Sequence, residues 1–359
     1  MGGIYRCTPM KSTRLYFIIP IFLIALSVLT RGGARPVSRR PMVMGWILSP
    51  YDTKSHYKTM REHADVITHL SPTRIRIDDA EGNVVCGKDN YTLAFAKKHD
   101  IAVLPLVANG DFDKDIAHAI FADPAKRTKV VDQLLTIIKR WKCPGINVDL
   151  ENLDAQDRPL LNAFMQELCD KFHANGLSVT IDVAAKTRDA PEAVWAGVYD
   201  YAFLGKCCDL VMLMCYDEHW SAGPPGPIGS KPWVRDCLKY ATSVMPKEKV
   251  VLGVPFYSYD WAEKGRTRSY TSKGIFKLMA ERKPTIQWDN KAKTHWFEYA
   301  DDEGNTRTVW YEDCESLKHK LALAQEFGVA GVSIWRLGDE DPAYWPLLAK
   351  YREGKRVLD

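Results

Sequence analysis

The residues best suited to chemistry lie in one short stretch, PGINVDLE at positions 144–151. Successive side chains of a strand point to opposite faces, so Asn147, Asp149 and Glu151 share one face and the apolar residues share the other. Burying an aspartate and a glutamate without partners is costly. The polar face is therefore a candidate catalytic site, and Glu151 lies at the C-terminal end of the stretch, where barrel active sites form. A cluster of salt bridges at the rim of the fold is the alternative that this pattern leaves open.

A second candidate stretch is MLMCYDEHW at positions 212–220. Met214 and Tyr216 are two residues apart in an extended run, so they share a face and the tyrosine hydroxyl points inward. Asp217 then begins the loop that follows. Ordinary core packing of Met214 and Tyr216 is the alternative.

Aromatic residues form the third group. Trp335 ends the apolar run VSIW at 332–335, where its ring can floor a pocket and stack on the C–H face of a sugar. Trp46 and Tyr257, associated with two other apolar runs, are candidates for the same wall. Filling of the hydrophobic core is the alternative for Trp335.

Short apolar runs alternate with helical patterns along the chain beyond about residue 40. The eight strand candidates are 43–48, 74–77, 101–106, 145–150, 177–182, 210–214, 250–254 and 331–335. Helical periodicity lies between them, at 129–141, 160–175, 232–244 and 317–327. Strands alternating with helices predict parallel βαβ units. Eight such units predict a closed (β/α)8 TIM barrel, whose active site forms at the C-terminal ends of the strands.

One interval breaks the alternation, and we interpret 261–313 as a small α+β insertion after the seventh strand. Its pattern predicts a helix over 273–282 and a hairpin over 294–311. The insertion is expected at the rim where barrel loops build the active site, and its exposed aromatics would wall one side of the binding groove. Its aromatic residues are Tyr270, Phe276, Trp288, Trp296, Phe297, Tyr299, Trp310 and Tyr311.

Composition places the chain among globular proteins. Of its 359 residues 46% are hydrophobic and 26% are charged, which excludes a disordered or fibrous chain. The net charge of +4 is due to the first 40 residues, which carry seven basic and no acidic side chains. The remainder is slightly acidic, so no nucleic-acid partner is expected.

The N-terminal 40 residues are expected to form a leader and linker preceding a catalytic barrel at 41–354. Positions 15–30 are uncharged and follow a basic start, the pattern of a secretory signal. A retained membrane anchor stays open as the alternative, although the run falls short of the roughly 20 residues that a spanning helix needs. A buried core helix is the third interpretation. Either of the first two predicts a secreted or membrane-anchored protein with its barrel outside the cytoplasm.

The nine cysteines include no C-x-x-C pair and no zinc-binding spacing. Because a chain of this length can build a large core, buried free thiols are preferred over a disulfide framework.

Together these stretches resemble glycoside hydrolase family 18, the chitinase family. Positions 144–151 are similar to its D-G-x-D-x-D-x-E signature, positions 214–217 match its M-x-Y-D element, and Trp335 matches its pocket-floor tryptophan. The stretches 216–220, 223–227 and 310–313 resemble one branch, the bacterial spore-cortex peptidoglycan N-acetylglucosaminidases. The resemblance spans about residues 41–350.

The resemblance implies retaining hydrolysis of β-1,4-linked N-acetylglucosamine glycans, either peptidoglycan or chitin-type, in which the substrate's acetamido group is the nucleophile. Glu151 would be the proton donor, Asp149 would accept the acetamido N–H, and Tyr216 would donate to the acetamido oxygen. No metal or organic cofactor is implied, and we expect a monomer. The residues expected to bind the substrate are Asn147, Met214, Asp217, Trp335, Trp46 and Tyr257.

Two positions depart from the family signature, because Pro144 and Asn147 stand where it has aspartates. Without a carboxylate at 147, Asp149 is expected to ionise more readily. Non-hydrolytic lectins of the family usually lose the acid at the Glu151 position, so its presence favours an enzyme over a carbohydrate-binding protein. A purely structural barrel is the third hypothesis, and the combination of Asp149, Glu151 and Tyr216 argues against it.

Overall fold

The computed structural model describes residues 40–48 and 55–358. The predicted signal or anchor lies outside these residues. Within them, no helix combines the length and the apolar character that a membrane crossing requires.

Eight parallel strands close into a barrel, because β1 pairs with both β2 and β15. In order around the barrel, the strands are β1 (Met42–Ile47), β2 (His69–Ile77), β5 (Leu106–Asn109), β6 (Gly145–Asp149), β7 (Ser178–Ala184), β8 (Leu210–Met214), β9 (Val250–Pro255) and β15 (Gly331–Trp335). These confirm the predicted (β/α)8 barrel. The third predicted run, 101–106, covers β4 (Ala102–Val103) but only the first residue of β5, which continues to Asn109. Pro105 lies between them and has no N–H to donate to a neighbouring strand.

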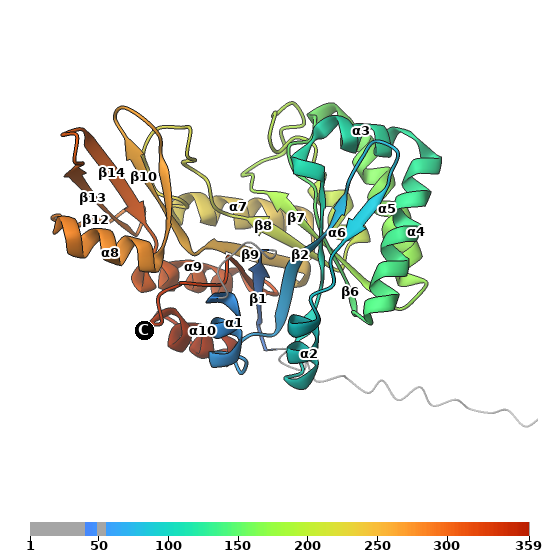
Figure 1. Ribbon diagram of the computed structural model, residues 1–359, viewed down its shortest axis with the longest axis horizontal. Coiled ribbons are helices and arrows are strands. Elements are labelled where there is room, and N and C mark those ends of the chain that lie inside the picture. The colour runs from blue at the N-terminus through green and yellow to red at the C-terminus, as the bar shows by residue number, and fades with distance from the viewer. Residues whose placement is uncertain (1–39, 49–54, 359) are drawn as a thin grey trace, which may run out of the picture. The chain divides into compact units, whose positions relative to one another are not determined.

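Helices surround the barrel (Figure 1). They are α1 (Ser55–Glu62), α2 (Asn90–Lys98), α3 (Lys114–Ala122), α4 (Pro124–Trp141), α5 (Arg158–His173), α6 (Tyr201–Cys207), α7 (Lys231–Val244), α9 (Cys314–Phe327) and α10 (Tyr344–Arg352). Local sequence explains their ends: at α4, the Asp123 side chain caps the N-terminus and Lys142 adopts a left-handed conformation at the C-terminus.

The two faces of β6 divide as the alternating pattern predicts. Ile146 and Val148 belong to the large apolar core that the barrel strands share with the helices. Trp46, Leu106 and Met212 belong to a separate apolar cluster. β6 pairs with β5, and this pairing sets Asn147 of β6 beside Leu106, a member of the second cluster. The polar residues of β6 therefore lie on the same side as that cluster.

The second sheet follows β9 and has five antiparallel strands, in the order β11-β10-β14-β13-β12. Their bounds are β10 (Tyr257–Ala262), β11 (Arg268–Thr271), β12 (Gln287–Asp289), β13 (Thr294–Ala300) and β14 (Thr306–Tyr311), and α8 (Ser272–Arg282) packs with them. Ile275, Leu278, Phe297, Val309 and Tyr311 form its own small core. The sheet therefore begins at Tyr257, four residues before the predicted boundary of the insertion, and Figure 1 shows it beside the barrel.

Candidate active site

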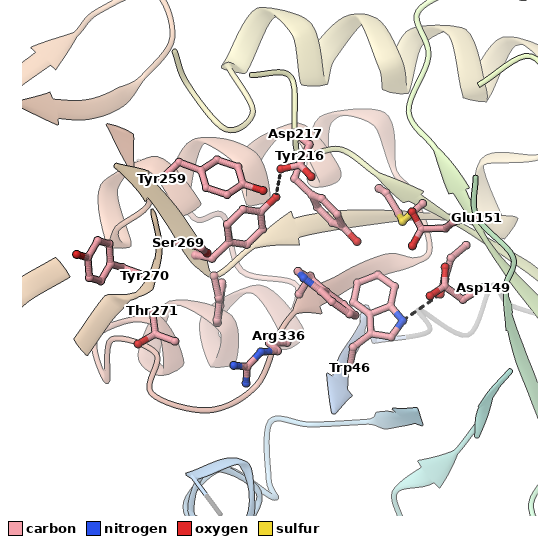
Figure 2. A pocket seen from close by; sticks show the side chains of 15 residues that line it. Trp46, Asp149, Glu151, Tyr216, Asp217, Tyr259, Ser269, Tyr270, Thr271 and Arg336 are labelled. Carbon is pink, nitrogen blue, oxygen red and sulfur yellow. Dashed lines mark hydrogen bonds between the residues drawn. The ribbon is translucent and has the colours of Figure 1, made fainter. Parts of the chain in front are cut away.

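A cavity of 490 Å³ lies where the barrel strands end and the second sheet begins (Figure 2). Every site residue predicted from the sequence lines it except Asn147. Those residues are Trp46, Asp149, Glu151, Met214, Tyr216, Asp217, Tyr257 and Trp335. The chain thus brings together side chains from β1, β6, β8, β10 and β15, as expected for a barrel active site at the C-terminal ends of the strands.

Glu151 follows β6, and its backbone is held by Asn109 of β5. The Asn109 side chain accepts a hydrogen bond from the Glu151 N–H (3.0 Å) and donates one to its carbonyl oxygen (3.0 Å). Burial, with a smaller contribution from the Asp217 carboxylate, raises the pKa of Glu151 to about 7. Glu151 can therefore hold a proton near neutral pH and lose it again, as a general acid and base must. Asn109 was not identified from the sequence, because its contact depends on two strands meeting.

Asp182 of β7 is the main functional candidate that the sequence analysis missed. Its carboxylate accepts hydrogen bonds from Trp46 Nε1 (3.1 Å) and Asn147 Nδ2 (2.7 Å). The pattern that could have revealed it is the alternation in 177–182, which places Thr180 and Asp182 on one face of a strand. Asp182 supplies the carboxylate that position 147 lacks.

The expectation that Asp149 ionises readily is therefore wrong. Burial, then the charges of Asp182 and Glu151, raises the pKa of Asp149 well above its usual value. Burial also raises the pKa of Asp182, but its two N–H donors favour its charged form. Within the described residues, Asp149 Oδ1 is buried and has no hydrogen-bond partner. Asp182 Oδ1 is likewise buried without a partner, so burial and mutual repulsion favour a proton on this pair of carboxyls.

Asn147 does not line the cavity, contrary to the substrate-binding role predicted for it. Its side chain is fully buried, accepts a hydrogen bond from Thr180 Oγ1 (2.6 Å) and donates to Asp182. It thus lies beneath the site and positions Asp182. The alternation placed it on the correct face, but Asp149 and Glu151 separate it from the opening.

Tyr216 and Asp217 lie on the side of the cavity nearer the second sheet. Burial and the surrounding carboxyls raise the pKa of Tyr216 well above its usual value, so its hydroxyl keeps its proton and can donate. Tyr257 donates a hydrogen bond to the Asp217 carboxylate, and the Tyr216 and Tyr257 rings meet edge to face at 6.1 Å. Tyr259 continues this aromatic wall along β10.

Trp335 and Trp46 meet edge to face, with ring centroids 5.9 Å apart. Trp46 is only 1% exposed, so its main contact is the hydrogen bond to Asp182. Trp335 is more exposed and presents the larger aromatic surface to the cavity. Tyr270, one of the insertion aromatics predicted from the sequence, also lines the cavity. Further lining residues not identified from the sequence are Phe256, Tyr259, Ser269, Thr271 and Arg336.

A second cavity of 650 Å³ adjoins the first and shares Asp149, Glu151 and Trp335 with it. It extends toward β2, β3 (Val84–Cys86) and β5, whereas the first cavity extends toward the second sheet. Glu151 therefore has space on two sides. Among the described residues, no three His, Cys, Asp or Glu side chains in either cavity bring their ligand atoms within 4.8 Å of one another.

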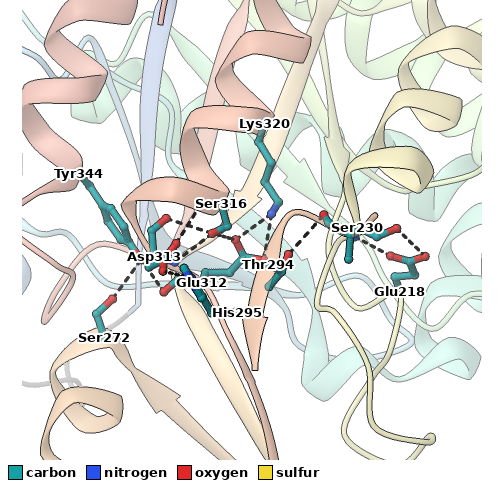
Figure 3. A network of polar contacts seen from close by, with 11 residues as sticks. Glu218, Ser230, Ser272, Thr294, His295, Glu312, Asp313, Ser316, Lys320 and Tyr344 are labelled. Atoms are coloured by element: carbon teal, nitrogen blue, oxygen red, sulfur yellow. Dashed lines mark hydrogen bonds and ion pairs between the residues drawn. The ribbon is translucent and has the colours of Figure 1, made fainter. Parts of the chain in front are cut away.

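The second sheet rejoins the barrel through a buried polar network (Figure 3). Glu312, which follows β14, accepts hydrogen bonds from Lys320 Nζ of α9 (2.7 and 2.9 Å) and from Ser316 Oγ (2.6 Å). Tyr344 of α10 donates to the Glu312 carbonyl oxygen (2.8 Å). This network ties the end of β14, which pairs with the wall strand β10, to two barrel helices.

Comparison with known proteins agrees with this geometry. The model of the family described as "Glycosyl hydrolases family 18" matches residues 50–341. An uncharacterised glycosylase of Bacillus subtilis, YvbX, is 28% identical over 95% of this chain and 99% of its own length. The cortical fragment-lytic enzyme of Bacillus subtilis is 31% identical over 69% of this chain and 58% of its own length. A chitinase structure from Chromobacterium violaceum superposes with a TM-score of 0.81 at 29% identity, covering 88% of this chain and 100% of that one.

Proposed function

Because this chain belongs to glycosyl hydrolases family 18 and is a glycosidase, we propose that it hydrolyses β-1,4-linked N-acetylglucosamine glycans with retention of configuration at the anomeric carbon. The observation that carries the proposal is the position of Glu151, an acid with a pKa raised to about 7, between two adjoining cavities. A sugar can lie on each side of it, with the bond between them beside its carboxyl group.

In the first step, Glu151 donates its proton to the glycosidic oxygen as the bond to C1 breaks. The carbonyl oxygen of the substrate's 2-acetamido group forms the new bond to C1, giving an oxazolinium ion. Asp149 Oδ1, the buried oxygen without a partner, accepts the acetamido N–H. That hydrogen bond favours the ionised form of Asp149, so the proton of the carboxyl pair moves to Asp182, whose Oδ1 has no other partner among the described residues. The negative charge on Asp149 then stabilises the developing positive charge.

In the second step, Glu151 accepts a proton from water while the water oxygen attacks C1. The oxazolinium ring opens, and the acetamido group and the protonated Glu151 are restored. Tyr216 donates to the acetamido oxygen throughout, which its raised pKa permits. Two displacements at C1 leave its configuration unchanged.

The experiment that tests the reaction follows the products of chitin oligomers by nuclear magnetic resonance and those of purified peptidoglycan by mass spectrometry. The β-anomer should form first, before it equilibrates with the α-anomer. Initial release of the α-anomer would contradict retention. Binding of either glycan without any product would support a non-hydrolytic carbohydrate-binding protein instead.

A thiazoline analogue of N-acetylglucosamine tests the nucleophile. It resembles the oxazolinium ion, so it should inhibit competitively. Trapping of a covalent glycosyl-enzyme, or failure of the analogue to bind, would reject participation of the acetamido group.

We also propose that the barrel acts outside the cytoplasm, on the basis of the basic start and the uncharged run at 15–30. Fractionation of the native host, with N-terminal sequencing of the mature protein, distinguishes a cleaved signal from a retained anchor. Recovery of the full-length protein in the cytosol would contradict both.

A further inference from the structure

Three cysteines from different parts of the sequence converge beside the barrel. Cys169 lies in α5, Cys207 ends α6, and Cys208 follows it. Their sulfur atoms all lie within 4.8 Å of one another, with 4.0 Å between Cys169 and Cys208 and 3.7 Å between Cys207 and Cys208. The sequence shows no metal-binding spacing here because the fold brings together residues 39 positions apart.

These separations suit ligands of one metal ion. Three thiolates at a metal–sulfur distance of about 2.3 Å lie about 3.8 Å apart in tetrahedral geometry. A disulfide would need two of the sulfur atoms at about 2.05 Å, much closer than they lie. Thiolate sulfur is a soft ligand, and it selects ions such as Zn²⁺ and Cu⁺ over Mg²⁺ or Ca²⁺.

An opening connects the cluster with solvent. A pocket of 270 Å³ is lined by Cys169 and Cys207, together with His173, Lys206, Asp209 and Lys249. An ion can enter from this side, and water can complete its tetrahedron there. A divalent ion with three thiolates carries a net negative charge, which the ammonium groups of Lys206 and Lys249 offset. Lys249 is held in place by a hydrogen bond to the Cys208 carbonyl oxygen (2.8 Å).

The cluster lies on the face of the barrel opposite the active site, because α5 and α6 end there and β7 and β8 begin there. We propose that Cys169, Cys207 and Cys208 bind one thiophilic d¹⁰ metal ion of the Zn²⁺ class, which links α5 to α6. The site is structural, since residues at this end of a barrel serve stability rather than catalysis.

The test titrates Cd²⁺ into the full chain after chelator treatment and reduction with a phosphine. One equivalent should bind and produce an ultraviolet sulfur-to-cadmium charge-transfer band, which Zn²⁺ should remove by competition. Cys169→Ser and Cys208→Ser should weaken binding at least tenfold, since the loss of an outer-shell partner alone costs about 10–100-fold. Zn²⁺ should raise the melting temperature of the parent protein and leave its rate of glycan hydrolysis unchanged.

Cys143→Ser is the matched control, because Cys143 is also a buried free thiol but lies outside the cluster. It should retain the band. Cys207→Ser keeps the test decisive if the two buried variants fail to fold, since Cys207 is partly exposed. No charge-transfer band in the reduced parent protein, or equal loss of the band in Cys143→Ser and Cys207→Ser, would overturn the proposal. So would a Cys169–Cys208 disulfide in the native protein with no metal bound after reduction.

Discussion

Asp149 ends β6 and Glu151 lies two residues further on, yet their surroundings differ in the way that their proposed roles require. Glu151 borders both cavities, and its pKa of about 7 allows it to exchange a proton during each turnover. Asp149 lies deeper, and burial together with the charges of Asp182 and Glu151 raises its pKa well above the usual value. Both side chains carry a carboxyl group, so the difference between their environments arises from their depth and their neighbours.

Replacing Glu151 with Gln should lower kcat by at least about 10²–10⁴-fold, the usual contribution of general acid–base catalysis. The amide has nearly the same shape, so folding and oligosaccharide binding should change little. Initial rates on chitin oligomers and calorimetric binding measure the two effects. Glu248→Gln changes an exposed glutamate in the same way and should leave both unchanged. Near-parental hydrolysis by Glu151→Gln would reject its assignment as the acid.

The activity should fall as the pH rises through about 7, because the first step needs the protonated form of Glu151. The negative charge of Asp217 contributes to the raised pKa of Glu151, so Asp217→Asn should lower that pKa and move the basic limb of the kcat/KM profile to lower pH. The position of the limb is independent of any loss of substrate binding. A limb that stays in place or moves to higher pH would contradict this electrostatic link.

At the scale of elements, the second sheet can wall the cavity only if it is held against the barrel. Its aromatic residues mostly serve its own structure: Phe297 and Tyr311 lie in its core, and Trp296 stacks on Trp310 across two strands. Of the insertion aromatics predicted to contact the glycan, Tyr270 lines the cavity. Tyr257 and Tyr259, on the strand that leaves the barrel, complete the wall.

Tyr270→Ala should therefore reduce kcat/KM on long oligosaccharides about 2- to 10-fold, as expected for the loss of about 0.5–1.5 kcal/mol of ring contact. A small chromogenic glycoside should be less affected, because it does not extend along the wall. Phe276→Ala is the control, since Phe276 is exposed on α8 and does not line the cavity. Equal losses on long and short substrates would show that Tyr270 does not contact the extended glycan.

The network in Figure 3, where the second sheet rejoins the barrel, is expected to contribute to the free energy of unfolding. Lys320 and Glu312 are 2% and 3% exposed at their side chains. Lys320→Ala leaves the Glu312 charge buried without its partner, so it should reduce the free energy of unfolding by about 3–5 kcal/mol. Urea denaturation measures the change.

Lys318→Ala, on the same helix but more exposed, should cost much less. The double variant Lys320→Met, Glu312→Leu should recover part of the lost stability, because no unpaired charge remains. If Lys320→Ala is as stable as Lys318→Ala, the buried pair does not anchor the sheet.

At the scale of the whole molecule, two cavities meet at Glu151 and extend in different directions over the barrel. One is walled by the second sheet, and the other is bordered by β2, β3 and β5. A polymer can therefore contact the protein on both sides of the bond that is cleaved. Binding energy from these distant contacts can contribute to the reaction at the centre.

We expect kcat/KM for chitin oligomers to rise with chain length until both cavities are filled. Phe112 is exposed and lines the second cavity, after β5. Phe112→Ala should reduce the increase of kcat/KM with chain length without changing the rate on the shortest substrate. Rates on a series of oligomers of increasing length measure this dependence. A rate independent of length would indicate that only the sugars next to Glu151 are bound.

Local pattern alone located seven of the eight barrel strands, the polar face of β6 and the candidate residues Tyr216 and Trp335, whereas the third barrel strand lies beyond its predicted run. These features depend on which residues alternate within a few positions, and such information is present in the sequence itself. The family resemblance then added roles for Glu151, Asp149 and Tyr216, which stay predictions until they are tested by mutation.

Only the tertiary structure decided which residues from different strands meet. The register that sets Asn147 beside Thr180 also brings Asp182 next to the catalytic strand, which reverses the expectation for Asp149 and moves Asn147 beneath the site. Tertiary contacts also decided three other features: the hydrogen bonds of Asn109 to the Glu151 backbone, the position of Tyr270 in the cavity wall, and the convergence of the three cysteines. Each depends on contacts between residues far apart in sequence, and local periodicity carries no information about how such segments align.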